Sequence, residues 1–125
     1  LLHDVGKTVL ANITPDLVKT GPPLSPAALS TLISDFHTNA GALIALKWNL
    51  PEVVRNVVKF HHQPEQTPGN VEMVELVYLA NGLLNAPEQL PELQQACRHL
   101  DLGPIDFAYV GEEMPAIAET AASII

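Results

Sequence analysis

Apolar residues recur at helical spacing along nearly the whole chain. The stretch from Pro26 to Trp48 is the clearest case. Its apolar positions are Leu29, Leu32, Ile33, Phe36, Ala40, Leu43 and Ile44. Intervals of three and four residues are typical of a helix with one buried face, and no stretch shows a convincing period of two that would indicate a strand. The pattern therefore predicts an all-α protein.

Prolines and capping residues divide this pattern into short helices. Ser25 followed by Pro26 is typical of a helix start, and Asn49–Pro51 is expected to end that helix and begin another that reaches His61 and His62. Asn70 is expected to cap a further helix. The other predicted helices cover residues 2–12, 71–85 and 87–100, with one short and one longer helix in residues 104–125. We therefore expect a compact, HD-domain-like bundle of five to seven short helices.

Length and composition fit one small domain with an aliphatic core. The chain has 125 residues, of which 47% are hydrophobic and only 5% aromatic. This length falls within the usual size of a single domain, so we expect residues 1–125 to form one domain. The first helical pattern begins without a visible start, which suggests that the domain is truncated at its N-terminus.

Charge and cysteine content narrow the classes of function. The net charge is −8, with only six Lys and Arg residues. This balance argues against nucleic-acid and anionic membrane partners, which require clustered cations. The single Cys97 cannot form an internal disulfide, and no apolar run has the length of a membrane span. A cytoplasmic protein is expected.

The candidate chemistry lies in the histidines. His3 is followed by Asp4, and His61 is followed by His62 at a predicted helix end. Neutral imidazole is the commonest metal ligand in proteins, and helical bundles build metal sites from His and carboxylate side chains of several helices. Alternatively, His61 and His62 cap the last carbonyl groups of their helix, and a buried His/Asp network holds the helices together without metal.

Four motifs in order carry a resemblance to a known family. His3–Lys7 resembles the H-D-x-G-K signature of the HD phosphohydrolase superfamily, and His37 stands four residues before Gly41 on a long helix. Trp48–Pro51 and His61–Pro64 resemble the W-x-L-P and H-H-x-P motifs of the HDOD domain, the HD-related output domain. The match covers roughly residues 1–85. The D-x-G-Y-P element of the HD-GYP phosphodiesterases is absent.

The resemblance implies a set of metal ligands. Carried over position by position, this set is His3, Asp4, His37, His61 and His62, with a final Asp replaced here by Asn81. A further His of the family pattern would precede residue 1. An amide oxygen lacks the charge of a carboxylate, so the site is expected to be weak or vestigial for a divalent metal such as Fe, Mn, Zn or Mg.

Three functions remain open at this point. The first is a bacterial-type signal-transduction module that acts through contacts with other signalling domains or proteins. The second is a metal-dependent phosphohydrolase or phosphodiesterase, in which Lys7 stabilises a phosphate. In a degenerate domain Lys7 would instead pair with Asp4 or lie in solvent. The third is a small-ligand sensor. The apolar Leu1, Leu2, Val5 and Val9 also predict that the chain forms a homo-oligomer through its first helix.

Overall fold

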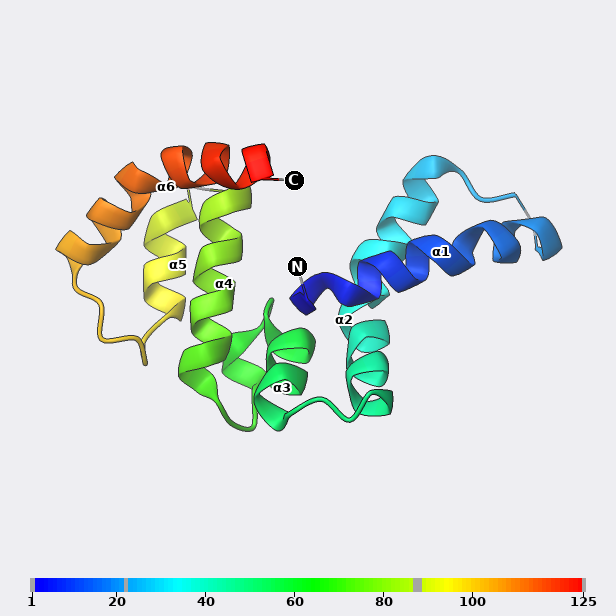
Figure 1. Cartoon of the computed structure of the whole chain (residues 1–125), viewed down its shortest axis with the longest axis horizontal. Helices are drawn as coiled ribbons and strands as arrows, with labels where there is room; N and C mark the ends of the chain where they lie inside the picture. The colour runs from blue at the N-terminus through cyan, green and yellow to red at the C-terminus, as the bar shows by residue number, and fades with distance from the viewer. Residues whose placement is uncertain (1, 22, 87–88, 125) are drawn as a thin grey trace. The chain divides into compact units, whose positions relative to one another are not determined.

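The structure is a computed structural model that describes residues 2–21, 23–86 and 89–124. The regular elements of these residues are six α-helices and two short 3₁₀ helices, with no strand among them (Figure 1). The all-α class and the expected number of helices are therefore confirmed. The chain divides into two compact units, residues 1–61 and 62–125. They are described separately, and one domain over residues 1–125 stays a prediction.

The first unit contains a 3₁₀ turn and three α-helices. They are η1 (Leu2–Asp4), α1 (Val5–Thr20), α2 (Pro26–Lys47) and α3 (Glu52–Phe60). Helix α1 packs along α2, and α2 packs against α3. The predicted end of the first helix near residue 12 is wrong, because α1 continues through Pro15. A proline lacks only one backbone N–H, and the helical bonds on either side of it carry the helix onward.

The predicted ends of the long helix are confirmed. The Ser25 hydroxyl accepts a hydrogen bond of 3.1 Å from the backbone N–H of Ala28, and Pro26 occupies the first turn of α2. At the other end, the Trp48 N–H donates to Ile44 O at 2.9 Å. Asn49 follows with a φ of 51°, a left-handed conformation that Asn tolerates better than most residues. This turn leads the chain directly into α3.

Two glycines bring α1 and α2 close together. A Cβ atom at Gly6 would lie 1.8 Å from the backbone oxygen of His37, and one at Gly41 would lie 3.3 Å from the Gly6 nitrogen. No side chain fits between these backbones, so glycine is required for this approach. The contact holds the start of α1, and with it Asp4, against the middle of α2.

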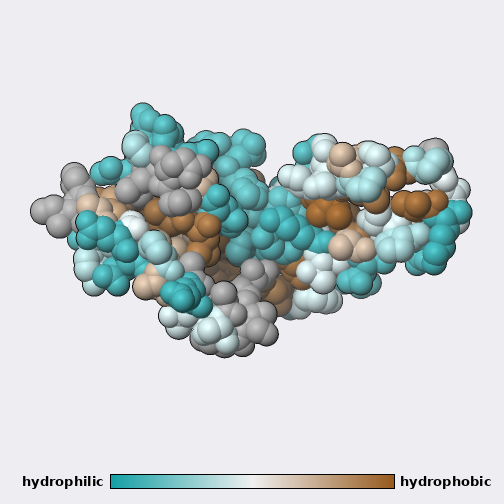
Figure 2. Space-filling view, turned by 90° about the horizontal axis from the view of Figure 1, so that it is seen from above, coloured by the Kyte–Doolittle hydropathy of each residue, from teal (hydrophilic) through white to brown (hydrophobic). Residues whose placement is uncertain are grey.

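The second unit contains η2 (Pro64–Gln66), α4 (Val71–Asn85), α5 (Leu90–Ala96) and α6 (Pro104–Ile124). Its core is aliphatic with one aromatic ring and one thiol: Leu79, Leu83, Leu93, Cys97 and Phe107. The space-filling view shows apolar surface interspersed with polar surface on both units (Figure 2). None of the helices that the structure describes is long and apolar enough to cross a membrane.

Two details of the second unit correct the predictions and one refines them. Asn70 is the N-cap of α4, as predicted, but it adopts φ 56° and its side chain makes no capping bond to the helix. Helix α5 ends at Ala96 rather than residue 100, because Cys97 leaves the helical region with ψ 59°; residues 87–88 lie outside the described part. The tail forms one helix instead of two, since α6 continues through Pro115.

Candidate metal centre

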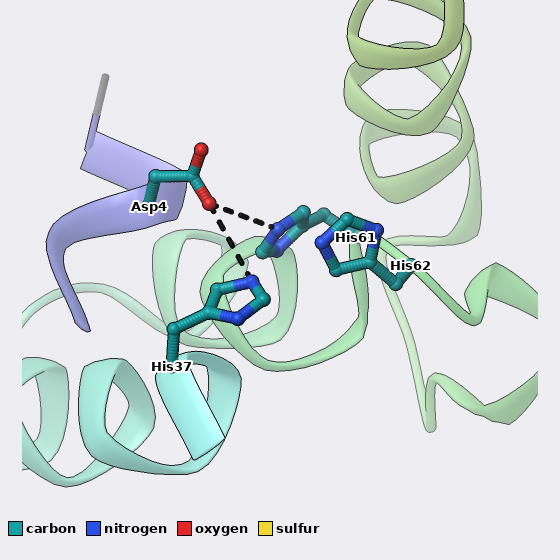
Figure 3. A group of neighbouring side chains, drawn as sticks. All are labelled: Asp4, His37, His61 and His62. Carbon is teal, nitrogen blue, oxygen red and sulfur yellow. Dashed lines mark ion pairs between the residues drawn. The ribbon is translucent and has the colours of Figure 1, made fainter. Parts of the chain in front are cut away.

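Three elements of the first unit bring a carboxylate and two imidazoles together. Asp4 ends η1, His37 lies in the middle of α2, and His61 is the C-cap of α3. The Nε2 atoms of His37 and His61 each lie 3.5 Å from the same Oδ1 atom of Asp4 (Figure 3). Both histidines are buried and Asp4 is partly buried. The geometry directs two ring nitrogens at one carboxylate oxygen.

Backbone carbonyl groups set the orientation of both rings. The Nδ1 atom of His37 lies 2.6 Å from Ser34 O. The Nδ1 atom of His61 lies 3.2 Å from Val57 O and 3.1 Å from Val58 O. A carbonyl oxygen only accepts, so Nδ1 of each ring carries the hydrogen and Nε2 of the neutral ring presents its lone pair. Metal-binding histidines are commonly oriented by this kind of hydrogen bond.

These carbonyl groups are the part of the site that sequence reasoning missed. They carry no side-chain signature. A usable signal was nevertheless present, because helix geometry places the carbonyl groups three and four residues earlier near a His side chain, and some rotamers bring its Nδ1 atom to them. His37 with Ser34, and His61 with Val57 and Val58, follow this spacing.

His3 and Lys7 also lie beside Asp4. The His3 Nε2 atom is 3.4 Å from Asp4 Oδ2, and its ring makes an edge contact with the His61 ring at 4.8 Å. The Lys7 ammonium donates to Asp4 Oδ2 at 2.9 Å. Lys7 therefore pairs with Asp4, and a role for Lys7 on a phosphate stays a prediction.

His62 and Asn81 complete the set of residues singled out from the sequence. His62 is exposed and is the first residue of the second unit; one ligand-type atom from each of Asp4, His37, His61 and His62 lies within 4.8 Å of the others. Asn81 lies on α4, where its side-chain oxygen accepts a hydrogen bond of 2.9 Å from Asn85 Nδ2. Its role as a metal ligand stays a prediction.

The carboxylate of Asp4 is held in its charged form. Burial by itself raises the pKa of Asp4, because it removes water from the carboxylate. The hydrogen bond from Lys7 and the electrostatic attraction of His3, Lys7 and His61 act in the opposite direction and hold this pKa below its usual range. Asp4 therefore carries a negative charge at neutral pH.

These donors fit a single metal ion. Asp4 Oδ1 is buried and makes no hydrogen bond within the described part of the chain. Its distance of 3.5 Å to each Nε2 exceeds the roughly 2.7–2.9 Å of a charge-assisted hydrogen bond. Two ligands that are each about 2.1 Å from a tetrahedral ion are about 3.4 Å apart. The spacing matches ligands that share one ion.

Comparison with known proteins identifies a family over the first half of the chain. The profile of the HDOD domain matches residues 1–64, which is just over half of the chain. The chain therefore belongs to the HDOD domain family.

Comparison with individual proteins gives less information than the family profile. The chain is similar to a protein of Treponema pallidum (strain Nichols) that is described as an uncharacterized protein. The two are 33% identical over 89 residues, and the match covers 65% of this chain and 17% of the relative. The chain thus spans less than a fifth of that relative. No solved structure matches it significantly.

Proposed function

We propose that this HDOD domain is a regulatory signalling module that acts through contacts with other proteins, and that its His/Asp cluster holds one divalent metal ion without turnover. The observation that carries the metal site is the pair of 3.5 Å distances from Asp4 Oδ1 to the Nε2 atoms of His37 and His61. An ion bound there would supply a positive charge that links η1, α2 and α3.

Two features support a regulatory role over catalysis. Within the described part of the chain, Asp4 is the one carboxylate of the cluster, and an amide, Asn81, stands where the family pattern has a second one. A centre with two metal ions, as used in many phosphate-cleaving enzymes, requires more negative charge than this. In addition, α2 exposes the large apolar side chains of Phe36, Leu43 and Leu46, as a surface for protein contacts does.

A metal-dependent phosphohydrolase is the second candidate. It is favoured by Lys7, whose ammonium lies 2.9 Å from Asp4 Oδ2, at the edge of the cluster. In that function Lys7 would hold a phosphate oxygen as negative charge develops on it. A bound metal ion would supply a nucleophilic hydroxide.

One preparation tests both candidates. The protein is purified without chelators, its metal content is measured by mass spectrometry, and it is assayed with bis(p-nitrophenyl) phosphate in the presence of Mn²⁺, Fe²⁺ or Zn²⁺. We expect about one metal ion per chain and no hydrolysis above the buffer rate. Hydrolysis that Lys7→Ala abolishes would replace our proposal with the second candidate. A chain that neither contains metal nor binds added metal would contradict the proposed ion.

A further inference from the structure

The second unit contains a pocket that is separate from the His/Asp cluster. Its walls are the start of α4 with η2 before it, and the end of α5 with the turn after it. The cavity volume is about 550 Å³. Cavities of about 300–1,000 Å³ are the usual size of small-ligand sites. The pocket can therefore hold a small organic molecule or one long side chain.

A buried carboxylate builds the polar part of this pocket. Glu75, on α4, is only 2% exposed. Its Oε2 atom accepts a hydrogen bond of 2.9 Å from the backbone N–H of His99, and its Oε1 atom lies 2.7 Å from His99 Nδ1. Since a carboxylate accepts only, Nδ1 carries the hydrogen, and Nε2 of the neutral ring is an acceptor. The His99 side chain is 62% exposed, so this acceptor is fixed in orientation and open to a ligand.

The charges of the lining select a cation. Besides Glu75, the carboxylates of Glu65 and Glu92 line the pocket, and among the described lining residues Arg98 is the one Lys or Arg. A recess lined mainly by one sign of charge attracts the opposite sign. Apolar wall is supplied by Pro64, Val71 and Ala96. A ligand that fits these features combines an ammonium group with a short hydrocarbon stem.

We propose that the α4–α5 pocket binds a primary ammonium group on an aliphatic chain. Glu65 and Glu92 would compensate the charge of the ammonium, and the lone pair of His99 Nε2 would accept one of its hydrogens. Pro64 and Val71 would contact the methylene groups. This chemistry occurs both in free alkyl diamines and in lysine side chains of proteins, so the experiment includes one probe of each kind.

Calorimetric titration of the whole chain tests the proposal with three five-carbon probes of different charge and one lysine peptide. 1,5-Diaminopentane represents the free amine, and the capped peptide acetyl-Gly-Lys-Gly-amide represents a lysine side chain. Pentanoate and 1-pentanol are the anionic and neutral controls. We expect heat of binding with at least one of the two amines and none with pentanoate or pentanol. Which amine binds more tightly identifies the source.

Variants locate the binding in the pocket. Glu92→Gln should weaken amine binding by about tenfold, because it removes a charged hydrogen-bond acceptor. Glu92 is exposed, so this change leaves the core intact. Glu72→Gln is the matched control: it makes the same change in charge at an exposed position of α4 outside the lining, and should leave binding unchanged.

Three results would overturn the proposal. They are no amine binding at millimolar concentration, tighter binding of pentanoate than of the amines, and an equal loss of binding in Glu72→Gln and Glu92→Gln. The last result would mean that the overall negative charge of the chain, and not the pocket, attracts the amine. Thermal unfolding of each variant confirms that it is folded before titration.

Discussion

Asp4 is the residue on which the proposed ion depends most. Among the cluster residues that the structure describes, it supplies the one carboxylate, and both Nε2 atoms face it. We predict that Asp4→Asn lowers the affinity for Zn²⁺ or Mn²⁺ by at least about tenfold, or about 1.4 kcal/mol. A ligand at 100 times its dissociation constant stabilises a protein by about 2.7 kcal/mol. The rise in melting temperature on metal addition should therefore shrink in the variant.

Asp16 supplies the matched control for Asp4. It also pairs with a lysine three residues later, with Lys19 Nζ at 3.1 Å, but it is exposed and distant in sequence from the cluster. Asp16→Asn removes the same charge and the same kind of ion pair. It should leave the effect of metal on the melting temperature unchanged. An equal loss in both variants would mean that net charge, and not a specific ligand, governs metal binding.

We predict that the buried thiol of Cys97 makes the free energy of unfolding depend on pH in the alkaline range. Burial, followed by the negative charge of Glu75, raises the pKa of the Cys97 thiol from 9.0 to about 11. Between these values the unfolded chain has released the proton and the folded chain still holds it. The stabilisation of the folded chain by the protonated thiol is therefore complete below pH 9 and declines as the pH rises toward 11. Two pKa units correspond to about 2–3 kcal/mol of unfolding free energy.

Urea unfolding of the wild type and Cys97→Ala at pH 8, 9, 10 and 11 measures this contribution. The variant loses the thiol at every pH, so the stability difference between the two proteins should narrow as pH rises. The pKa of Tyr78 is also raised, first by burial and next by the negative charge of Cys97, so its effect changes when Cys97 is removed. Both proteins are therefore compared in a Tyr78→Phe background, where only the thiol differs. A stability difference that stays constant across this range would contradict the prediction.

At the scale of elements, Gly6 controls the contact of α1 with α2. We predict that Gly6→Ala destabilises the chain by about 1–3 kcal/mol, the usual range for overpacking, because the new Cβ would lie 1.8 Å from His37 O. The helices would have to separate, and Asp4 would move with α1 away from the two imidazoles. Urea unfolding measures the first effect, and metal titration measures the second.

Gly103→Ala is the control for this change. A Cβ atom there meets only the Asp106 carboxylate at 3.4 Å, an ordinary contact, and no glycine within the described residues has a positive φ. Its unfolding free energy should change by less than about 0.5 kcal/mol. A Gly6→Ala protein as stable as Gly103→Ala would mean that α1 and α2 do not pack as described.

The sequence predicted the ends of a helix correctly where a residue type has a characteristic position at a helix start or end. Ser25 and Pro26 marked the start of α2, and Asn49 marked its end. Interior prolines were less informative. Pro15 and Pro115 lie inside helices, because the loss of one hydrogen bond is outweighed by packing along the rest of the helix. Local sequence does not reveal that packing.

The two sites likewise differ in how much of them the local sequence predicts. The motif order predicted that Asp4, His37 and His61 would come together, and the structure places them around one oxygen atom. Nothing local indicated that Glu75 would bind His99, 24 residues later in the chain. Such a pairing depends on how α4 packs with the turn after α5, and only the tertiary structure reveals it.

At the scale of the whole molecule, charge and apolar exposure act against each other. The net charge of −8 opposes the approach of a second copy. However, α2 exposes Phe36, Leu43 and Leu46 at 55%, 69% and 60%, spaced at seven and three residues along the helix. Removing apolar surface from water yields roughly 25 cal/mol per Å², and salt does not screen this gain. The balance between electrostatic repulsion and apolar burial should therefore depend on ionic strength.

Val5 and Val9 of the first helix, through which the sequence predicts association, are partly buried. We therefore place the contact between copies on the exposed face of α2, and predict that self-association strengthens as salt rises. At about 0.01 M salt the charges repel over about 30 Å, whereas at 0.1 M they are screened beyond about 10 Å. Sedimentation velocity at a fixed protein concentration should show a larger species at the higher salt. The double variant Leu43→Glu/Leu46→Glu should be monomeric at both. Ser30→Glu/Thr31→Glu adds the same two charges at exposed polar positions of α2 and should still associate at the higher salt. Monomers of the wild type at both salt concentrations would mean that this face is not covered by a second copy.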